Sequence, residues 1–378
     1  MSLKNTYFKM GKKEFDIYLK NLKESNNTIH LLNNKYFFVQ SIDVLNMALE
    51  LNKKMTKLDM ILNSYSEFAK RQIIQSFLID EIESTNEIEN IHSTRHDILS
   101  VINNASQSRN KKIISISNAY KQLLETKGVR INTLKDIRSM YDTILCDAIE
   151  KNDLPDGLYF RTKDVYISDG FKPIHLGAVG EKNVNELMKE FLSLYNSNNE
   201  TFIKMILCHF IFENIHPFYD GNGRLGRFLF SNGLYLETNS YFSFAISSSI
   251  EHEKDKYYKA FEKADDKYEF CCLNEFVNII LSILINQIDL LIKKLEDDKK
   301  NMNKTNITMG LTKSELRIYN LISEASILSF FGLSNEEIMK EANVSKRTLI
   351  YTLNKFKEKG ILLDTKIGKI TYHKIKKV

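Results

Sequence analysis

Proline occurs at only three positions in this 378-residue chain, and Pro155, Pro173 and Pro217 all lie in one stretch near the middle. Because proline interrupts helices, the long segments on either side are free to form them. Residues 66–90 show helical spacing most clearly, since their apolar side chains recur at steps of three and four: Phe68, Ile73, Ile74, Phe77, Leu78, Ile82 and Ile88. The sequence therefore predicts a mostly α-helical protein.

The proline-containing stretch predicts a β-hairpin in the middle of the chain. Pro155-Asp156-Gly157 ends the helical spacing, and residues 159–174 then alternate around Val165 and Ile167, with a Ser-Asp-Gly turn at 168–170. Helices are expected to resume beyond it, with the second ending before His216-Pro217 because proline disfavours helix in the residue ahead of it. The expected ranges are 183–196, 201–214, about 223–236 and 273–296.

Length and composition indicate a soluble protein of two or three domains. Hydrophobic residues make up 43% of the chain and charged residues 27%, which is typical of globular proteins. We expect no membrane span, because no apolar run approaches roughly 18 residues, and no signal peptide is apparent. The cysteines lack metal-ligand spacing, so we expect reduced thiols and a cytoplasmic location; they are Cys146, Cys208, Cys271 and Cys272.

The C-terminal part has a different pattern. Residues 296–310 are polar and are expected to form a linker. Beyond it, 334–342 and 345–359 predict two helices, the second with Ser345 as N-cap and ended by Gly360. Two strand-like runs follow around 366–369, which is the order of a winged helix-turn-helix domain.

Basic residues exceed acidic ones in this C-terminal part. Residues 311–378 contain 13 lysines and arginines against 7 acidic residues, so a DNA partner and a protein partner both remain open. The candidate phosphate contacts are Lys346, Arg347, Lys355 and Lys357, with Lys359, Lys366 and Lys369 nearby.

Residues 216–227, HPFYDGNGRLGR, contain the densest group of reactive side chains. Gly221 and Gly223 permit positive φ around Asn222, so that consecutive N–H groups can point at one anion at the start of the next helix. Arg224 and Arg227 share a face of its first turn and suit phosphate oxygens. Cations there oppose the helix dipole, so an anionic ligand is needed.

Two further side chains extend this phosphate site. Asp220 suits a Mg²⁺ ion that bridges phosphates, and His216 is the side chain that can accept a proton near neutral pH. Each feature alone is more often a turn, a loop residue or a surface charge. Together, in a fixed order, they indicate a polyphosphate clamp with a general base at its edge.

The same twelve residues fit the HxFx(D/E)GNGRxxR signature of the Fic (Fido) family. The segments GLYFRTKDVYISDGFKPIHL and SSSIEHEKDKYYKAF also resemble that family, so the resemblance extends over about residues 66–285. It implies a helical Fic fold with a β-hairpin flap. It also implies transfer of AMP from ATP to a Ser, Thr or Tyr hydroxyl of a target protein, and of this protein itself.

The resemblance assigns a role to each motif residue. His216 would deprotonate the hydroxyl, Asp220 would hold Mg²⁺, and Phe218 would anchor the loop. The flap would register the target as an added strand. Nucleotide contacts would come from Gly221, Asn222, Gly223, Arg224, Gly226 and Arg227, with Arg227 at the γ-phosphate and Tyr257 and Tyr258 near the adenine.

A second motif lies upstream, at residues 84–90, STNEIEN. It resembles the (S/T)xxxE(G/N) inhibitory motif of Fic proteins, with Asn90 as the variant ending. Thr85 and Glu89 are four residues apart on a predicted helix and share a face. The resemblance implies that Glu89 pairs with Arg227 and blocks seating of the γ-phosphate, whereas a glutamate on a helix is otherwise most often solvated.

These observations predict four regions. An N-terminal helical region with the inhibitory motif covers 1–110, a Fic core 111–295, the linker 296–310 and the winged helix 311–378. Two alternatives remain open beside AMP transfer. One is a transcription regulator with a Fic-like nucleotide sensor, and the other is removal of AMP or transfer of another phosphate-containing group. A homodimer also remains open.

Overall fold

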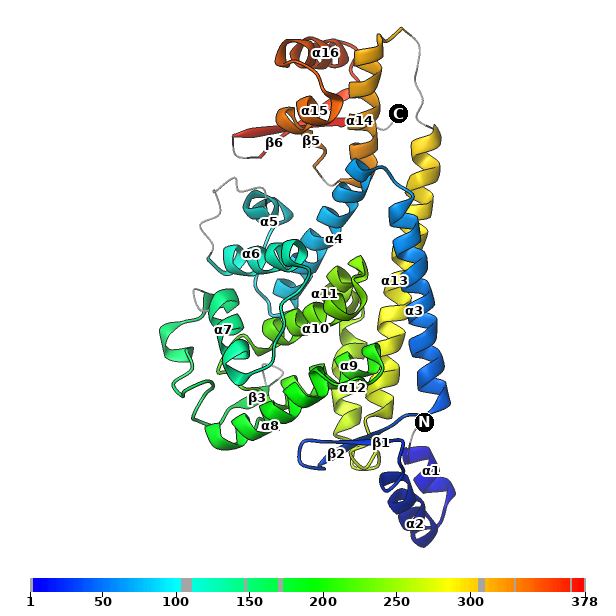
Figure 1. Cartoon of the computed structure of the whole chain (residues 1–378), viewed down its shortest axis with the longest axis vertical. Coiled ribbons are helices and arrows are strands. Elements are labelled where there is room, and N and C mark those ends of the chain that lie inside the picture. The colour runs from blue at the N-terminus through cyan, green and yellow to red at the C-terminus, as the bar shows by residue number, and fades with distance from the viewer. Residues whose placement is uncertain are drawn as a thin grey trace.

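The computed structural model describes residues 3–102, 111–145, 148–168, 173–304, 310–329, 331–367 and 369–376, and it confirms a mostly helical protein (Figure 1). The helices before the middle hairpin are α1 (Leu3–Lys9), α2 (Lys12–Lys23), α3 (Ile42–Asn63), α4 (Glu67–Ile88), α5 (Arg95–Ile102), α6 (Lys111–Thr126) and α7 (Leu134–Leu145). Those after it are α8 (Gly180–Tyr195), α9 (Thr201–Ile215), α10 (Asn222–Thr238), α11 (Ile246–His252), α12 (Lys254–Ala264), α13 (Asn274–Lys304), α14 (Lys313–Leu328), α15 (Asn335–Ala342) and α16 (Lys346–Glu358).

The strands form three small antiparallel sheets. They are β1 (Thr28–Leu31) with β2 (Tyr36–Val39), β3 (Tyr166–Ser168) with β4 (Pro173–Leu176), and β5 (Leu333–Ser334), β7 (Ile370–Ile375) and β6 (Leu362–Ile367) in that spatial order. The hairpin expected in the middle of the chain is present as β3–β4, although residues 169–172 of its turn lie outside the described residues. The β1–β2 hairpin was not predicted.

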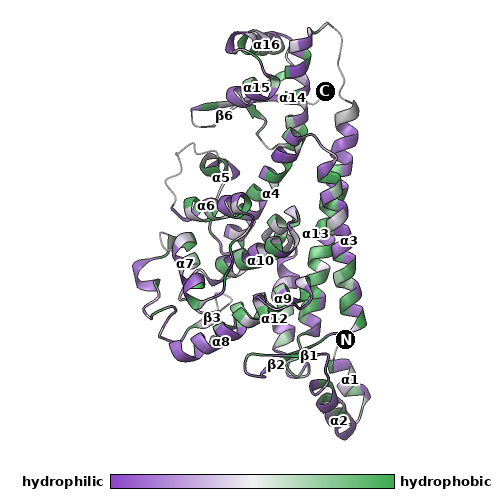
Figure 2. Ribbon diagram, in the orientation of Figure 1, coloured by the Kyte–Doolittle hydropathy of each residue, from purple (hydrophilic) through white to green (hydrophobic). Residues whose placement is uncertain are grey.

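Two long helices, α3 and α13, run side by side along one edge of the molecule (Figure 1). The expected end of α13 at 296 was wrong, because the helix continues to Lys304 and takes in much of the predicted linker. Residues 296–301 of this end are hydrophilic and partly or fully exposed (Figure 2), so polarity there marks solvent exposure and not a break. Residues 305–309 and the polar segment 103–110 lie outside the described residues.

The apolar character of α13 also exceeds what was expected. Asn274–Asn301 is long and apolar enough, by length and composition, to cross a membrane. More than half of its most apolar window, 56%, is buried inside the protein. The buried residues belong to the main hydrophobic core shared with α3 and α9, so in this fold the stretch serves as a core helix.

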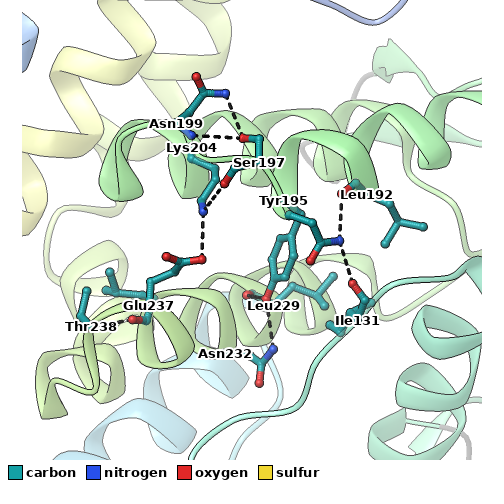
Figure 3. A network of polar contacts seen from close by, with 12 residues as sticks. Ile131, Leu192, Tyr195, Ser197, Asn199, Lys204, Leu229, Asn232, Glu237 and Thr238 are labelled. Atoms are coloured by element: carbon teal, nitrogen blue, oxygen red, sulfur yellow. Dashed lines mark hydrogen bonds and ion pairs between the residues drawn. The ribbon is translucent and has the colours of Figure 1, made fainter.

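Helices α9 and α10 form the centre of the core and hold the site motif between them. Nearly every side chain of α9 is buried. At the end far from the motif, the buried Lys204 donates to Ser197 O at 2.9 Å and pairs with Glu237 at 3.0 Å (Figure 3). Asn232 donates to the hydroxyl of Tyr195, which donates to Leu229 O, so α8 and α10 are tied together.

Helix α4 crosses the molecule from the C-terminal module to the site (Figure 1). Its buried Glu81 is its strongest attachment to the core: Ser247 donates its backbone N–H (2.7 Å) and hydroxyl (2.6 Å) to the carboxylate. The hydroxyls of Tyr120 (3.1 Å) and Ser231 (3.3 Å) and the backbone N–H of Ser248 (3.4 Å) also donate to it. Burial raises the pKa of Glu81, and the Ser247 bonds partly offset this. The carboxylate fixes the rotation of α4 about its own axis.

The C-terminal module has the helix–turn–helix and hairpin order that was expected. Ser345 caps α16 by accepting from Thr348 N, and the chain between α15 and α16 turns at Asn343, which has positive φ. Strand β7 pairs with both β5 and β6. Gly368, inside the expected wing turn, lies outside the described residues.

The core of this module includes one residue from α4. Phe68, 7% exposed, packs in the same hydrophobic cluster as Ile318 and Leu349 of the module. Two polar contacts flank it, because Arg71 pairs with Glu341 at 2.6 Å and Ser66 donates to Glu324 at 3.2 Å. The start of α4 is therefore part of the C-terminal module, and its end is part of the site.

Replacing Phe68 with alanine should destabilise the attachment of the module. A buried phenylalanine truncated to alanine typically costs about 3–5 kcal/mol. Denaturant unfolding, followed by circular dichroism, should show a separate early transition or a much lower denaturant concentration at the midpoint. The matched control is Phe8→Ala, since Phe8 is 65% exposed and its loss should leave the midpoint nearly unchanged. Equal curves for both variants would contradict the packing described.

Candidate functional site

His216 follows the last residue of α9, where the helix ends in a left-handed residue. Its φ of 53° and ψ of 63° turn the chain sharply, and its N–H still bonds to Phe212 O. A non-glycine residue in this conformation is uncommon and has to be held by its surroundings. Pro217 follows and cannot continue the helix. The imidazole is thereby placed at the mouth of the loop, with Nδ1 3.4 Å from Glu213 O.

The loop between His216 and α10 is built around Phe218 and Asn222. Phe218 is fully buried, stacks on Tyr141 at 3.8 Å between ring centroids and meets Phe160 edge to face. The Asn222 side chain accepts from Phe218 N at 2.9 Å and donates to Phe218 O at 2.8 Å. Asn222 therefore shapes the loop with its side chain, and its contribution to an anion site comes through its backbone.

The two glycines of GNG serve different purposes. Gly221 has the positive φ (85°) that was expected, and it caps α10. The expectation was wrong for Gly223, which lies inside the helix. It has to be glycine for space, because a Cβ would stand 2.1 Å from Glu89 Oε1 and 3.0 Å from Arg227 Nη1. Gly223 leaves room over the helix for an anionic group beside Arg227.

Asp220 and Arg224 lie together at the start of α10. Arg224 is nearly completely buried, and its Nη2 is 3.4 Å from Asp220 Oδ1. Among the described residues, its Nε has no hydrogen-bond partner. A buried donor is costly to leave unpaired, so an anion at this helix start would satisfy it.

Arg227 is buried and paired with the end of α4. Its Nη2 donates to Glu89 Oε1 at 2.8 Å and to Thr85 O at 3.0 Å, while its Nε donates to the Thr85 hydroxyl at 2.9 Å. The ion pair expected between Glu89 and Arg227 is therefore present. Glu89 lies just past the last helical residue and Asn90 has positive φ, so the motif ends the helix instead of continuing it.

Glu89 and Arg227 each stabilise the charged form of the other. Burial alone would raise the pKa of Glu89, but Arg227, assisted by Arg224 and His216, more than offsets this, and the pKa lies below its usual value. Burial likewise opposes the charge on Arg227, and Glu89 raises its pKa again. Both groups are ionised at neutral pH. Since the Glu89 pKa is lowered, the pair is fully formed above its usual value and is lost only when the pH falls through the lowered one.

Two of the residues expected to contact the nucleotide also pack against α9, and their contact with a nucleotide stays a prediction. Gly226 faces α9, where a Cβ would stand 2.3 Å from Glu213 Oε1, so it permits close helix packing. Tyr257 is buried, its hydroxyl is 2.9 Å from His209 Nε2, and its ring meets Phe261 edge to face. Tyr258 is the exposed member of the pair at 44%, and it is the one whose ring is open to a ligand.

The polar groups behind Arg227 are kept neutral by burial. Burial and the nearby Arg227 lower the pKa of His209 to about 3. Burial raises the pKa of Glu213 to about 8, even though Arg227 acts in the opposite direction and Glu89 adds to the rise. At pH 7 the imidazole and the Glu213 carboxyl are therefore both uncharged, which leaves Glu89 as the charge that balances Arg227.

The residues present fit a Mg²⁺ ion held partly by a nucleotide. Among the described residues, no group of three or more His, Cys, Asp or Glu side chains is arranged to hold a metal by itself. Asp220 is 47% exposed beside the start of α10. Mg²⁺ commonly takes one or two carboxylates together with substrate phosphates and water. A single carboxylate next to a phosphate site matches that pattern.

Sequence reasoning missed Glu213 and Glu81. Both are carboxyl groups on helix faces that lie in the core, whereas a glutamate on a helix is most often solvated. The available signal was a glutamate at helical spacing among large apolar side chains: Glu213 lies between Phe212 and Ile215, and Glu81 between Leu78 and Ile82. A charged residue inside an apolar stripe indicates a buried partner.

Comparison with known proteins supports the family resemblance. Residues 132–234 match the Fic/DOC family. "Protein adenylyltransferase Fic" of Drosophila sechellia is 24% identical over 247 residues, covering 63% of this chain and 46% of the relative. That of Drosophila melanogaster is 24% identical over 240 residues, covering 61% and 44%. The chain thus matches less than half the length of these curated relatives.

A solved structure shows the same fold over most of the chain. A Fic family protein from Desulfovibrio desulfuricans G20 superposes with a TM-score of 0.55 at 18% identity, over 90% of this chain and 98% of that one. The family match includes the whole HPFYDGNGRLGR motif. Together these findings show a mostly helical fold like that of the Fic structure, and a Fic/DOC match over the part of the chain that carries the motif.

The raised pKa of Glu213 predicts how stability depends on pH. The folded protein keeps the Glu213 proton up to about pH 8, whereas the unfolded chain releases it near the usual value of 4.5. Stability should therefore fall as the pH rises between those values. In Glu213→Gln, which cannot ionise, this loss should be smaller, with the remainder coming from other buried carboxyls such as Glu81. Melting temperatures of both proteins at pH 5.5 and 8 test it, and the same decrease in the variant would contradict a buried, protonated Glu213.

Proposed function

We propose that this protein is an autoinhibited protein adenylyltransferase, which transfers AMP from ATP to a Ser, Thr or Tyr hydroxyl of a target protein and of itself. The proposal rests chiefly on one observation. His216, Asp220, the start of α10 and two buried arginines converge at one place, and the Arg227 there is already engaged by a carboxylate from outside the core. The Fic match and the distant adenylyltransferase relatives support a transferase of this class.

The chemistry follows from the placement of these groups. The target hydroxyl loses its proton to the imidazole of His216, and its oxygen forms a bond to the α-phosphorus of ATP. The bond from that phosphorus to the bridging oxygen breaks, and pyrophosphate leaves with the electron pair. A general base of this kind typically contributes about 10²–10⁴-fold in rate. His216 lies at the left-handed turn after α9, close enough to act electrostatically on Glu89 beside Arg227.

The other residues bind and orient the nucleotide. The backbone N–H groups at the start of α10 and the unpaired Arg224 Nε meet phosphate oxygens, and Arg227 meets the γ-phosphate. A Mg²⁺ ion held by Asp220, when bound, would neutralise charge on the phosphates. The exposed Tyr258 ring is the candidate contact for the adenine.

Glu89 competes with ATP for Arg227. While the 2.8 Å pair holds, Arg227 cannot also bind the γ-phosphate, and the carboxylate repels that phosphate. Gly223 shows the limited space, since the Glu89 oxygen occupies the position where any larger side chain would stand. ATP then binds without its α-phosphorus in line with the attacking oxygen, and such misplacement is costly.

A second function belongs to the C-terminal module. The predicted set of four cations is reduced, because Lys355 pairs with Glu315 at 2.7 Å and Lys357 with Asp364 at 2.6 Å. Lys346 and Arg347 remain exposed at the start of α16, next to the exposed Tyr351. We propose that this end of α16 binds DNA in the cytoplasm, and a protein partner is the alternative that the test distinguishes.

Replacing Glu89 with glycine should raise AMP transfer at least about tenfold, a barrier change of about 1.4 kcal/mol. Glu89 lies past the last helical residue, so glycine there carries little of the usual helix penalty. Glu89→Gln removes the charge and keeps the shape, and it should activate as well. The measurement is incorporation of label from α-³²P-ATP into protein, with γ-³²P-ATP to detect phosphoryl transfer and His216→Ala as the blank.

Three outcomes would separate the alternatives. Equal incorporation by wild type and both Glu89 variants would end the inhibitory role. Label from the γ-position would replace adenylyl by phosphoryl transfer. Loss of pre-attached AMP with no incorporation would identify a de-AMPylating enzyme, and nucleotide binding without any turnover would support a sensor in a transcription regulator.

The DNA proposal predicts a steep salt dependence. Each phosphate contact contributes a slope of about −0.9 in a plot of log affinity against log salt. Lys346→Glu with Arg347→Glu should abolish gel shifts of random duplex DNA at low salt. The matched control is Lys13→Glu with Lys20→Glu on α2, which changes the net charge equally at exposed positions elsewhere. Wild type that stays unbound at low salt would favour a protein partner.

A further inference from the structure

Arg161 is a buried cation at the junction of the β3–β4 flap and the loop that begins at His216. Its side chain is completely buried, and it lies just before the β3–β4 hairpin. Its guanidinium donates hydrogen bonds to four backbone carbonyls. Burying a charge without a directly hydrogen-bonded carboxylate is costly, and burial lowers the pKa of Arg161 below its usual value although Asp164 and Tyr219 act in the opposite direction. Such a costly arrangement is retained only where the surrounding structure holds the guanidinium and its carbonyl partners in place.

The carbonyls come from two directions. Nε donates to His216 O at 2.8 Å and Nη2 to Ile215 O at 3.3 Å, both at the C-terminal end of α9. A cation suits that end because the last carbonyls of a helix lack partners and carry its negative partial charge. The backbone N–H of Arg161 also donates to Pro217 O at 3.1 Å. Arg161 therefore holds the main chain on both sides of His216.

The remaining two bonds hold the flap. Nη1 donates to Lys163 O at 2.6 Å, where the chain enters the hairpin, and Nη2 to Ala178 O at 2.8 Å, where it leaves. Ala178 N in turn donates to Ile215 O at 3.0 Å. One guanidinium thus joins both legs of the flap to the residue that carries the imidazole.

Gly177 shows how closely these parts approach. A Cβ at Gly177 would stand 2.7 Å from Arg161 Nη2, 3.1 Å from Ile215 O and 3.3 Å from His216 Cβ. The end of the flap therefore lies directly against the guanidinium and the base of the His216 side chain. Because no space is left between these groups, a movement of any one of them would displace the others.

We propose that Arg161 is a positioning residue that fixes the flap relative to His216, and so sets the distance between the target hydroxyl and the general base. This proposal rests on the proposed function, since it concerns how a target strand bound to the flap presents its hydroxyl to His216. A misplacement of about 1 Å can reduce a rate by about 10²-fold. Loss of Arg161 should therefore lower the maximal rate of AMP transfer while ATP still binds.

The test uses the full chain carrying Glu89→Gly, so that transfer is measurable. Adding Arg161→Gly should lower the maximal rate about 10²-fold and leave the KM for ATP within about twofold, since no ATP contact is removed. Millimolar guanidinium or ethylguanidinium should restore part of the rate by filling the vacated site, whereas sodium chloride at equal ionic strength should not. Arg161→Lys serves if the glycine variant does not fold, and it should lose rate in the same way because one ammonium cannot reach carbonyls on both sides.

Lys204→Met is the matched control. Lys204 is an equally buried cation at the opposite end of α9, bound to Ser197 O and Glu237 (Figure 3). The Lys204→Met variant should be less stable than the parent protein and keep the same maximal rate. An unchanged rate in both Arg161 variants, a joint loss of rate and ATP binding, or the absence of guanidinium rescue in a folded glycine variant would overturn the positioning role. If Glu89→Gly with Arg161 intact transfers no AMP, the proposed function itself fails and the Arg161 role falls with it.

Discussion

A buried guanidinium needs an anion, and at Arg227 the ends of α4 and α9 and the start of α10 together determine which group supplies it. Charge burial is tolerated only with close partners. His209 and Glu213 are both neutral behind it, so the balancing charge has to come from in front. In the described state Glu89 supplies it, and the Thr85 hydroxyl and carbonyl complete the coordination. In the proposed function a nucleotide phosphate replaces Glu89, because Arg227 requires a negative charge that either group supplies.

The contiguous parts of this site could be predicted from the sequence. HPFYDGNGRLGR carries its own geometry, since a proline ends α9, a glycine turns the chain and the next helix starts at once. The pairing of Glu89 with Arg227, across 138 positions, followed from a resemblance and not from spacing. The order of elements in the C-terminal module was equally readable, because caps such as Ser345 and Asn343 act within a few residues.

The remainder depends on contacts that no local pattern carries. Arg161 reads as one more basic residue before a hairpin, and its partners become visible only when α9 and the flap are brought together. The β1–β2 hairpin is fixed by its neighbours too, because Glu190 of α8 accepts from the backbone N–H groups of Leu32 and Asn33. Gly223 and Gly226 were assigned to flexibility or ligand contact, and the structure adds a steric reason for each: a larger residue would meet Glu89 and Arg227 at Gly223, and Glu213 and Phe212 of α9 at Gly226. Tertiary packing decides such positions.

The course of α4 has a consequence for anyone who shortens this chain. Twenty-two residues of helix rise about 33 Å, enough to carry one rigid element from the core of the C-terminal module to the clamp. Removing residues 311–378 would strip the apolar neighbours from Phe68 and leave Arg71 without Glu341. In a truncated protein, α4 would therefore start with an exposed aromatic ring and without its contacts to the module. Under the proposed inhibition by Glu89, any gain in turnover would come from a less firmly held α4 and not from the absence of a DNA-binding or docking activity.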